Sequence, residues 1–325
     1  MVSPVSDVHT TIVDIGARYG LHPSWKNYRS PAVYHLVEAD PEECGRLKKR
    51  YEKFTNVHVH NIAILDRTGT TKLLILSNPA MSGTSLRRDI SPLYWKERGS
   101  QTNIVQEREI ECIDLNSFRS SIGSRIDFLK LDTEGTEFDV LKNYAHLDEL
   151  LGVRSEVCFD RLFDGVRLDT FSSIHSLMLD AGFVLLNMDY NGKGDYFSRM
   201  ISSNGRYGIL LSSDAVWIKK PLSVLDTEDA VKILKMVLFL FRNHAPDLAL
   251  WMLEKGRESI VSAEESSLKE YAKYCTVTHF YTIKWEPSQN VQEHKAFFES
   301  VFQDEYPEMN KFNESLTYNP VEDIV

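Results

Sequence analysis

The sequence predicts an α/β protein with a doubly wound, mostly parallel sheet, followed by a helical appendage at the C-terminus. Two observations lead to this prediction. Short β-branched segments alternate with amphipathic helical segments across residues 10–220, which is typical of right-handed βαβ crossovers. From Pro221 onward the strand pattern thins out and helical periodicity dominates. We therefore predict one domain over residues 1–220 and a helical region over residues 221–325.

The predicted elements follow one another closely in the first 220 residues. Strands are expected where apolar or β-branched residues run together and end at Gly, Asp or Asn. Their ranges are 11–15, 33–37, 57–62, 72–76, 109–113, 126–132, 153–159, 183–188 and 215–219. Helices are expected from Pro41, after Gly135 and over 171–179. The helix from Pro41 carries its acids first and its bases last, the order that the helix dipole favours.

The last third of the chain differs in composition. It holds 10 Lys and Arg against 18 Asp and Glu, so it carries −8 of the formal charge of −10. Helices are expected over residues 227–241, 246–254, 263–274 and 291–302. Each has an apolar face that must be covered, so we expect this region to form a lid over the first domain or a homodimer interface.

Composition and charge exclude several classes of protein. With 42% hydrophobic and 26% charged residues, the chain has the composition of a folded globular protein. Its net negative charge disfavours nucleic acid as a partner. The longest apolar run, residues 236–241, is far short of the ~20 residues of a membrane span. Four scattered cysteines and an N-terminus without a signal-peptide pattern lead us to expect a cytoplasmic protein.

The first predicted strand ends in a glycine-containing turn that suits a nucleotide-like cofactor. Asp14, Gly16 and Gly20 lie in it, and a glycine there lets the backbone approach a ligand. The dinucleotide fingerprint would need glycines where Arg18 and Leu21 stand, so a pyrophosphate is disfavoured. Asp14 instead suits a cationic amino group. An ordinary tight turn remains the alternative.

Glu38 ends the second predicted strand. A carboxylate at this place can accept both hydroxyl protons of a ribose. The alternative is that Glu38 merely begins the next helix. Together with Asp14 and Gly16, Glu38 describes a site for a ribose and an amino-acid moiety without a pyrophosphate, which is the shape of S-adenosylmethionine.

A third set of charged residues follows the strand at 126–132. Lys130 and Asp132 share one side of that strand, and Asp132 and Glu134 lie at its carboxyl end, where open α/β sheets bind substrates. Glu156 is a candidate buried carboxylate in the next strand, with a salt bridge to a neighbouring base as its alternative role. For Glu137 and its neighbour Asp139 we expect exposed acids of a first helical turn.

These residues lie in an ordered set of motifs that resembles the FkbM-type methyltransferases, a family of class I S-adenosylmethionine-dependent enzymes. The motifs are D-I-G-A-R-Y-G, V-E-A-D-P, N-I-A-I-L-D-R-T-G, I-E-C-I-D-L-N-S-F, I-D-F-L-K-L-D-T-E-G-T-E-F-D-V-L and A-G-F. The resemblance covers about Thr11 to Lys219 and says nothing about residues 221–325. It implies a seven-stranded Rossmann-like sheet with a reversed last strand. It also implies O-methylation, often of a sugar hydroxyl in a glycan or natural product.

The resemblance also implies roles for single residues. Asp14, Gly16 and Gly20 correspond to the cofactor loop, Glu38 to the ribose acid, Asn61 to Ala63 to the adenine site, and Asp132 and Glu134 to the residues facing the transferred methyl group. Two features depart from the family pattern. Ala39 stands where proline is usual, and the bulky pair Arg18–Tyr19 is expected to narrow the pocket.

Methyl transfer to an alcohol needs an aligned oxygen and a group that removes the hydroxyl proton. Asp132 or Glu156 can act as the base, or Asp132 with Glu134 can hold a Mg²⁺ ion that acidifies the hydroxyl. The sequence does not decide between these mechanisms. His22 is the histidine nearest the predicted site, although a solvated histidine is the simpler interpretation.

Two other functions remain open. A nicotinamide-dependent sugar oxidoreductase would need a third glycine at position 21, where Leu21 stands. A non-catalytic scaffold of methyltransferase fold is disfavoured by the presence of Asp14, Glu38 and Asp132. Acceptor specificity is expected to come from the long segments Ser77–Arg98 and Asn191–Arg206 or from the C-terminal third.

Overall fold

The computed structural model describes residues 9–22, 24–25, 32–85, 102–163, 170–188, 195–197 and 209–262. They fall into two compact units. The first unit holds Thr10–His22 and Ala32–Lys220. The second unit holds the described residues from Pro221 onward, together with His9, Ser24 and Trp25. The helices expected over 263–274 and 291–302 lie outside the described residues.

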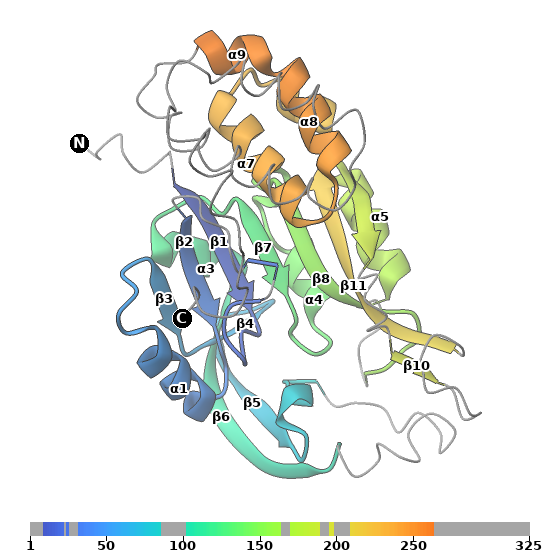
Figure 1. Ribbon diagram of the computed structural model, residues 1–325. Helices are drawn as coiled ribbons and strands as arrows, with labels where there is room; N and C mark the ends of the chain where they lie inside the picture. Colours follow the sequence, from blue (N-terminus) through green and yellow to red (C-terminus); the bar gives the residue numbers. More distant parts are fainter. Residues whose placement is uncertain are drawn as a thin grey trace, which may run out of the picture. The chain divides into compact units, whose positions relative to one another are not determined.

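The first unit is built on one large, mostly parallel sheet (Figure 1). Its strands are β1 (Thr10–Ile15), β2 (Ala32–Val37), β3 (Val57–His60), β7 (Phe128–Leu131), β8 (Gly152–Cys158), β9 (Phe183–Met188), β10 (Asp195–Phe197) and β11 (Ile209–Lys219). The order is β10-β11-β8-β7-β1-β2-β3, with β9 also paired to β11. The strands run outward from β1 in both directions, which confirms the doubly wound α/β class.

The last strand is reversed, as the family resemblance implies. β11 runs antiparallel to β8 on one edge, and antiparallel to β9 and β10 on the other. β10 is a short strand that the sequence pattern does not predict. With it, the described part of the sheet has eight strands where seven are expected.

Alternation along the strands gives the sheet two different faces. Val13, Leu129, Val153 and Trp217 point into an apolar core with residues of α3, α4 and α5. These helices span Leu115–Ile122, Glu137–Lys142 and Phe171–Asp180. The intervening residues of the same strands, Asp14 among them, point to the opposite face. The charged residues Asp14, Lys130 and Arg154, which are in register on β1, β7 and β8, therefore share that face.

A second, three-stranded sheet belongs to the same unit. It consists of β4 (Ala63–Leu65), β5 (Gly69–Leu76) and β6 (Ile104–Asp114), in the order β4-β6-β5. The short 3-10 helix η2 (Pro79–Met81) follows β5, and the chain then returns to that strand. There Leu74 N donates to Gly83 O at 2.9 Å, and Leu76 N to Ser82 Oγ at 3.0 Å. These bonds fix residues 82–85 against the sheet.

Another helix of this unit, α1 (Pro41–Tyr51), begins a few residues after β2, and the short 3-10 helix η4 (Leu147–Glu149) precedes β8. Asp40 is the N-cap of α1, with Oδ1 accepting a hydrogen bond from Glu42 N at 3.0 Å, and Pro41 occupies the first helical position. The cap sets the direction in which the chain leaves β2. Glu38, two residues before Asp40, is thereby held at the carboxyl end of β2.

The second unit is helical in its described part. It contains α6 (Pro221–Leu225), α7 (Ala230–Arg242), α8 (Pro246–Lys255) and α9 (Arg257–Ser262). Every residue of α7 from Ile233 to Phe241 is buried, Lys235 included. Trp25 packs on Phe239 with ring centroids 5.7 Å apart, and Lys235 Nζ donates to His9 O at 2.9 Å. None of the described helices reaches the length and apolarity that a membrane crossing requires.

Candidate active site

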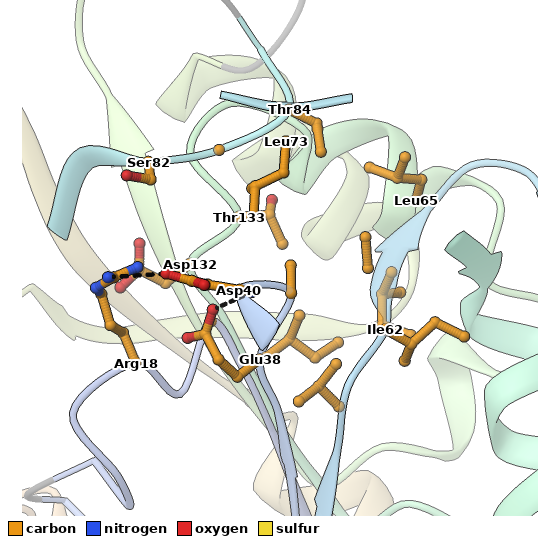
Figure 2. A pocket seen from close by; sticks show the side chains of 17 residues that line it. Arg18, Glu38, Asp40, Ile62, Leu65, Leu73, Ser82, Thr84, Asp132 and Thr133 are labelled. Atoms are coloured by element: carbon orange, nitrogen blue, oxygen red, sulfur yellow. Dashed lines mark hydrogen bonds and ion pairs between the residues drawn. The ribbon is translucent and has the colours of Figure 1, made fainter. Parts of the chain in front are cut away.

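A cavity lies at the carboxyl ends of β1, β2 and β7, and Figure 2 shows the side chains that surround it. The large sheet and the three-stranded sheet both contribute to its wall. The lining residues are Ile15, Gly16, Arg18, Val37, Glu38, Ala39, Asp40, Ile62, Ala63, Ile64, Leu65, Leu73, Ser82, Gly83, Thr84, Asp132 and Thr133. A cavity at this edge of an open parallel sheet is where such folds bind ligands.

Gly16 brings two loops together at the floor of the cavity. Its φ is +77°, and a Cβ there would lie 1.9 Å from Asp132 O, so no other residue fits. Gly20 also has a positive φ of +94°, but it packs on Tyr51, whose Oη would be 2.5 Å from an added Cβ. Gly20 does not line the cavity. The absence of a side chain at Gly20 allows the loop to pack closely on α1.

Glu38 lines the cavity, as the sequence predicts. Its carboxylate is buried and Oε1 accepts a hydrogen bond from Asp40 N at 2.7 Å. Burial raises the pKa of Glu38 to about 7, although the Asp40 N–H and the Arg18 guanidinium favour the ionised form. The group therefore titrates near neutral pH.

Residues 61–63, which are expected to lie at an adenine ring, line the cavity only in part. Ile62 and Ala63 line it, whereas Asn61 does not. The Asn61 side-chain amide donates to Glu38 O at 3.0 Å and to Ala39 O at 3.2 Å. Asn61 thus ties the end of β3 to the end of β2 and shapes the site from outside.

Arg18 and Tyr19, the two bulky residues of the turn after β1, lie in different surroundings. Arg18 lines the cavity and its Nη2 lies 3.1 Å from Asp40 Oδ2, an ion pair drawn in Figure 2. Arg108 of β6 reaches the other oxygen of Asp40 at 3.3 Å. Tyr19 is 69% exposed and is not among the lining residues. Of this pair, only Arg18 lines the cavity, and narrowing of the pocket by the pair stays a prediction.

Beside the cavity, a row of charges crosses three neighbouring strands. Asp14, Lys130 and Arg154 are in register on β1, β7 and β8. Lys130 Nζ lies 3.5 Å from Asp14 Oδ1 and 3.1 Å from Asp132 Oδ2, and it donates to Gly16 O at 3.2 Å. Burial alone would lower the pKa of Lys130, but the Asp132 and Asp14 carboxylates raise it. The ammonium of Lys130 is therefore paired with two carboxylates.

Asp14 is fully buried beneath this cation. Burial raises its pKa, and the nearby Lys130 charge opposes that rise. Its Oδ2 accepts a hydrogen bond from His22 N at 2.9 Å. Asp14 thus fixes both ends of the loop from residue 14 to 22. The structure shows it holding the loop and its neighbour Lys130.

One level nearer the carboxyl edge, the charges are all negative. Asp132 follows β7 at the level of Glu156 on β8, and Glu156 is in register with Asp214 on β11. One carboxylate oxygen each of Asp132, Glu134 and Glu156 lies within 4.8 Å of the other two. Such a set of oxygens fits a hard divalent cation such as Mg²⁺.

Asp214 is a member of this cluster that the sequence analysis does not identify. Its Oδ2 lies 3.2 Å from Arg154 Nη1 and 3.7 Å from His22 Nε2. Burial raises the pKa of Asp214, and the Arg154 charge opposes the rise. Asp214 directly precedes the predicted strand 215–219. This position was the only feature of the sequence that could have indicated its place in the site. His22 is thereby placed at the edge of the carboxylate cluster.

Glu137 does not behave as an exposed acid of a first helical turn. It is 3% exposed, and its carboxylate turns back onto the preceding loop. Asp139 in the same turn is half-buried. The expectation of a solvent-exposed position was wrong for Glu137, because the α4 turn folds under the Asp132–Gly135 loop.

The expected specificity segments are described only in part. Of Ser77–Arg98, residues up to Ser85 are described, and Ser82 to Thr84 line the cavity. Of Asn191–Arg206, only β10 is described, and the rest lies outside the described residues.

Comparison with known proteins identifies one family. Residues 14–185 match the family model described as the methyltransferase FkbM domain. No curated protein matches the sequence.

Several solved structures resemble the fold at low identity. The N-terminal domain of EvdMO1 with SAH bound shares 12% identity, covering 65% of this chain and 74% of that one, with a TM-score of 0.33. A SAM-dependent methyltransferase from Aquifex aeolicus shares 10%, covering 64% and 81%, with a TM-score of 0.30. A precorrin-6y C5,15-methyltransferase from Geobacter metallireducens GS-15 shares 11%, covering 65% and 82%, with a TM-score of 0.29. At these scores the assignment rests on the family model alone.

Proposed function

Because the chain belongs to the FkbM methyltransferase domain family, we propose that it transfers a methyl group from S-adenosylmethionine to a hydroxyl of a sugar or a related polyhydroxylated acceptor. The observation that carries this proposal is the position of Glu38. The buried carboxylate of Glu38 directly follows β2 and lines a cavity whose wall also holds Gly16 and Asp132, which lie in close contact. That arrangement suits a ribose held next to a methyl-transfer centre.

In this proposal different residues of the cavity bind different parts of the cofactor. The ionised Glu38 would accept hydrogen bonds from the ribose hydroxyls. Ile62, Ala63 and Leu65 offer an apolar wall to the adenine ring. Asp132 and the Gly16 turn face the methionine end, where an acidic environment favours the cationic amino and sulfonium groups.

The carboxylate cluster is the proposed acceptor site. Asp132 and Glu156 are the candidates to take the proton of the acceptor hydroxyl, and the buried Lys130 holds Asp132 in place through its 3.1 Å contact. His22 lies at the edge of the same cluster, with its Nε2 3.7 Å from Asp214 Oδ2. The register of β7, β8 and β11 therefore supplies both hydrogen-bond acceptors for hydroxyls and a base for one of them.

The same oxygens are the donor set that Mg²⁺ prefers, so Asp132, Glu134 and Glu156 would hold the ion if the reaction uses one. When bound, a divalent cation acidifies a coordinated hydroxyl. Lys130 has no part in binding it, because its ammonium already faces Asp132 and Asp14.

Calorimetry on the full chain with S-adenosylmethionine, S-adenosylhomocysteine and NADP tests the cofactor part of this proposal. We expect both sulfur compounds to bind and NADP not to bind. Binding of NADP instead would favour an oxidoreductase, and a folded protein that binds none of the three would favour a scaffold.

Incubation with S-adenosylmethionine and a panel of methyl glycosides, followed by mass spectrometry and NMR of the product, tests the acceptor and the atom methylated. Parallel reactions with EDTA and with added Mg²⁺ decide the role of a metal. We expect Asp132→Asn to lose turnover by at least a hundredfold, while Glu109→Gln on the exposed part of β6 retains it. Methylation at nitrogen or carbon would contradict O-methyl transfer.

A further inference from the structure

The turn that carries Asp132 and Glu134 has an unusual backbone. Glu134 has a φ of +60° and Gly135 a φ of +104°, so two successive residues lie in the left-handed region. For a residue with a long side chain such as Glu134 this conformation is unfavourable. It persists only where the surroundings impose it. Something outside the turn must therefore hold it.

Two of the neighbours that hold the turn do so by close packing. A Cβ on Gly83 would lie 2.7 Å from Glu134 Cβ, so this glycine allows residues 82–85 to lie directly on the turn. A Cβ on Gly135 would lie 2.6 Å from the Phe163 ring. These contacts limit where the turn can go. They do not define where its N–H groups point.

Glu137 supplies the polar contacts. One of its carboxylate oxygens accepts hydrogen bonds from Thr133 N at 2.6 Å and from Thr133 Oγ1 at 2.9 Å. The other accepts one from Gly135 N at 3.1 Å. Two backbone donors that flank Glu134 thus converge on a single side chain. The arrangement is that of an anion bound by a concave turn, with the chain's own carboxylate as the anion.

An ionised carboxylate is the group that these donors require. All three partners are hydrogen-bond donors, and an ionised carboxylate is an acceptor only. A glutamine of the same shape would place an NH₂ against at least one N–H or O–H. Burial raises the pKa of Glu137, and the two hydrogen bonds from Thr133 oppose that rise by favouring the charged form.

We propose that Glu137 is a positioning residue of the active site: its buried carboxylate fixes the left-handed turn so that Thr133 and Asp132 face the cofactor cavity and Glu134 faces Glu156. The proposal rests on the proposed function for its consequence, cofactor binding. The hold on the turn itself is independent of that function.

Glu137→Gln tests it, with Asp139→Asn as the matched control in the same helical turn. Hydrogen exchange measured by mass spectrometry should show at least tenfold faster exchange in peptides covering residues 132–136 of Glu137→Gln. Peptides covering β1 and β8 should be unchanged. Calorimetry with S-adenosylhomocysteine should give a dissociation constant raised at least tenfold, and Asp139→Asn should match the natural protein in both measurements.

Unchanged exchange in the turn of Glu137→Gln overturns the proposal, as does an equal loss of protection in every strand, which would indicate a purely structural role. Unaltered affinity despite a faster turn also overturns it. If Glu137→Gln does not fold, Glu137→Asp, which keeps the charge on a shorter side chain, replaces it with the same expected results. If the natural protein binds no S-adenosylhomocysteine, the proposed function fails and the exchange experiment alone decides whether Glu137 holds the turn.

Discussion

Glu38 shows how one residue can serve a ligand at the expense of the fold. Its pKa is about 7 in the folded chain, against 4.5 for an ordinary glutamate, chiefly because of burial. A carboxyl whose folded pKa is raised stabilises the fold below the unfolded pKa, and that contribution is lost as pH rises through the folded pKa. The loss between pH 4.5 and 7 is on the order of 3 kcal/mol, at about 1.4 kcal/mol per unit.

Replacing Glu38 by glutamine should therefore raise stability and impair binding together. We expect Glu38→Gln to unfold at a higher temperature than the natural protein at pH 8, with a much smaller difference at pH 5. Its affinity for S-adenosylhomocysteine should fall about 10- to 100-fold, because a charge-assisted acceptor is worth ~1.5–3 kcal/mol. Thermal melts at both pH values and calorimetry measure these effects. Equal melting shifts at pH 5 and 8 would show that ionised Glu38 does not strain the fold.

At this scale the sequence predicts residues whose role depends on their place at a strand end. Gly16, Glu38 and Asp132, which the sequence analysis selects for the site, line the cavity, and their cofactor and catalytic roles stay predictions. Asp214 and Glu137 are not predicted as members of the site. Asp214 depends on the register between β8 and an antiparallel strand, and Glu137 on a turn that folds back over its own helix. Neither property is visible in a single stretch of sequence.

Among the elements, the three-stranded sheet is the least predictable. The sequence predicts strands near 72–76 and 109–113, and these fall within β5 and β6. It does not predict that they leave the main sheet, because alternation marks a strand without naming its partner. β4 pairs in parallel with β6 across a separation of about 50 residues. Through this sheet, Ser82, Gly83 and Thr84 reach the wall of the cavity.

Gly83 tests how closely this element must approach the turn. The Cβ of Gly83→Ala would meet Glu134 Cβ at 2.7 Å, so the segment or the turn must shift. We expect a loss of ~1–3 kcal/mol in unfolding free energy and weaker binding of S-adenosylhomocysteine. Gly45→Ala is the control, since its Cβ meets nothing within 4 Å and alanine favours the α1 helix by ~0.5–1 kcal/mol. Denaturant unfolding that finds both variants more stable would contradict the close approach.

At the scale of the whole molecule, the predicted boundary at residue 220 stays a prediction, and the structure adds a complication to it. His9 and Trp25 belong to the same compact unit as the chain from Pro221, although they precede the boundary by about 200 residues. The sequence pattern follows local periodicity and cannot detect such a return of the chain.

The homodimer is also still a prediction. The apolar surface of α7 is buried within one chain, so this helix offers little of it to a partner.

A chain ending at Lys220 should therefore be less stable than the full chain. Trp25, 1% exposed, would lose its packing against Phe239, and the Lys235 contact to His9 O would be lost as well. We expect a lower melting temperature and tryptophan emission shifted to the red. Trp25→Phe in the shortened chain should remove part of that shift. A shortened chain that melts like the full one, with unshifted emission, would show that the first unit is independent.

The carboxylates beside the cavity have a consequence for turnover. Asp132, Glu134, Glu156 and Asp214 outnumber the two cations that neighbour them, Lys130 and Arg154. In the proposed reaction the cofactor enters with a positive sulfur and leaves with a neutral one. Attraction between that sulfur and the acidic groups vanishes when the methyl group departs. In that reaction the charge pattern would hold the methylated cofactor more tightly than the demethylated product, which would favour product release after each turnover.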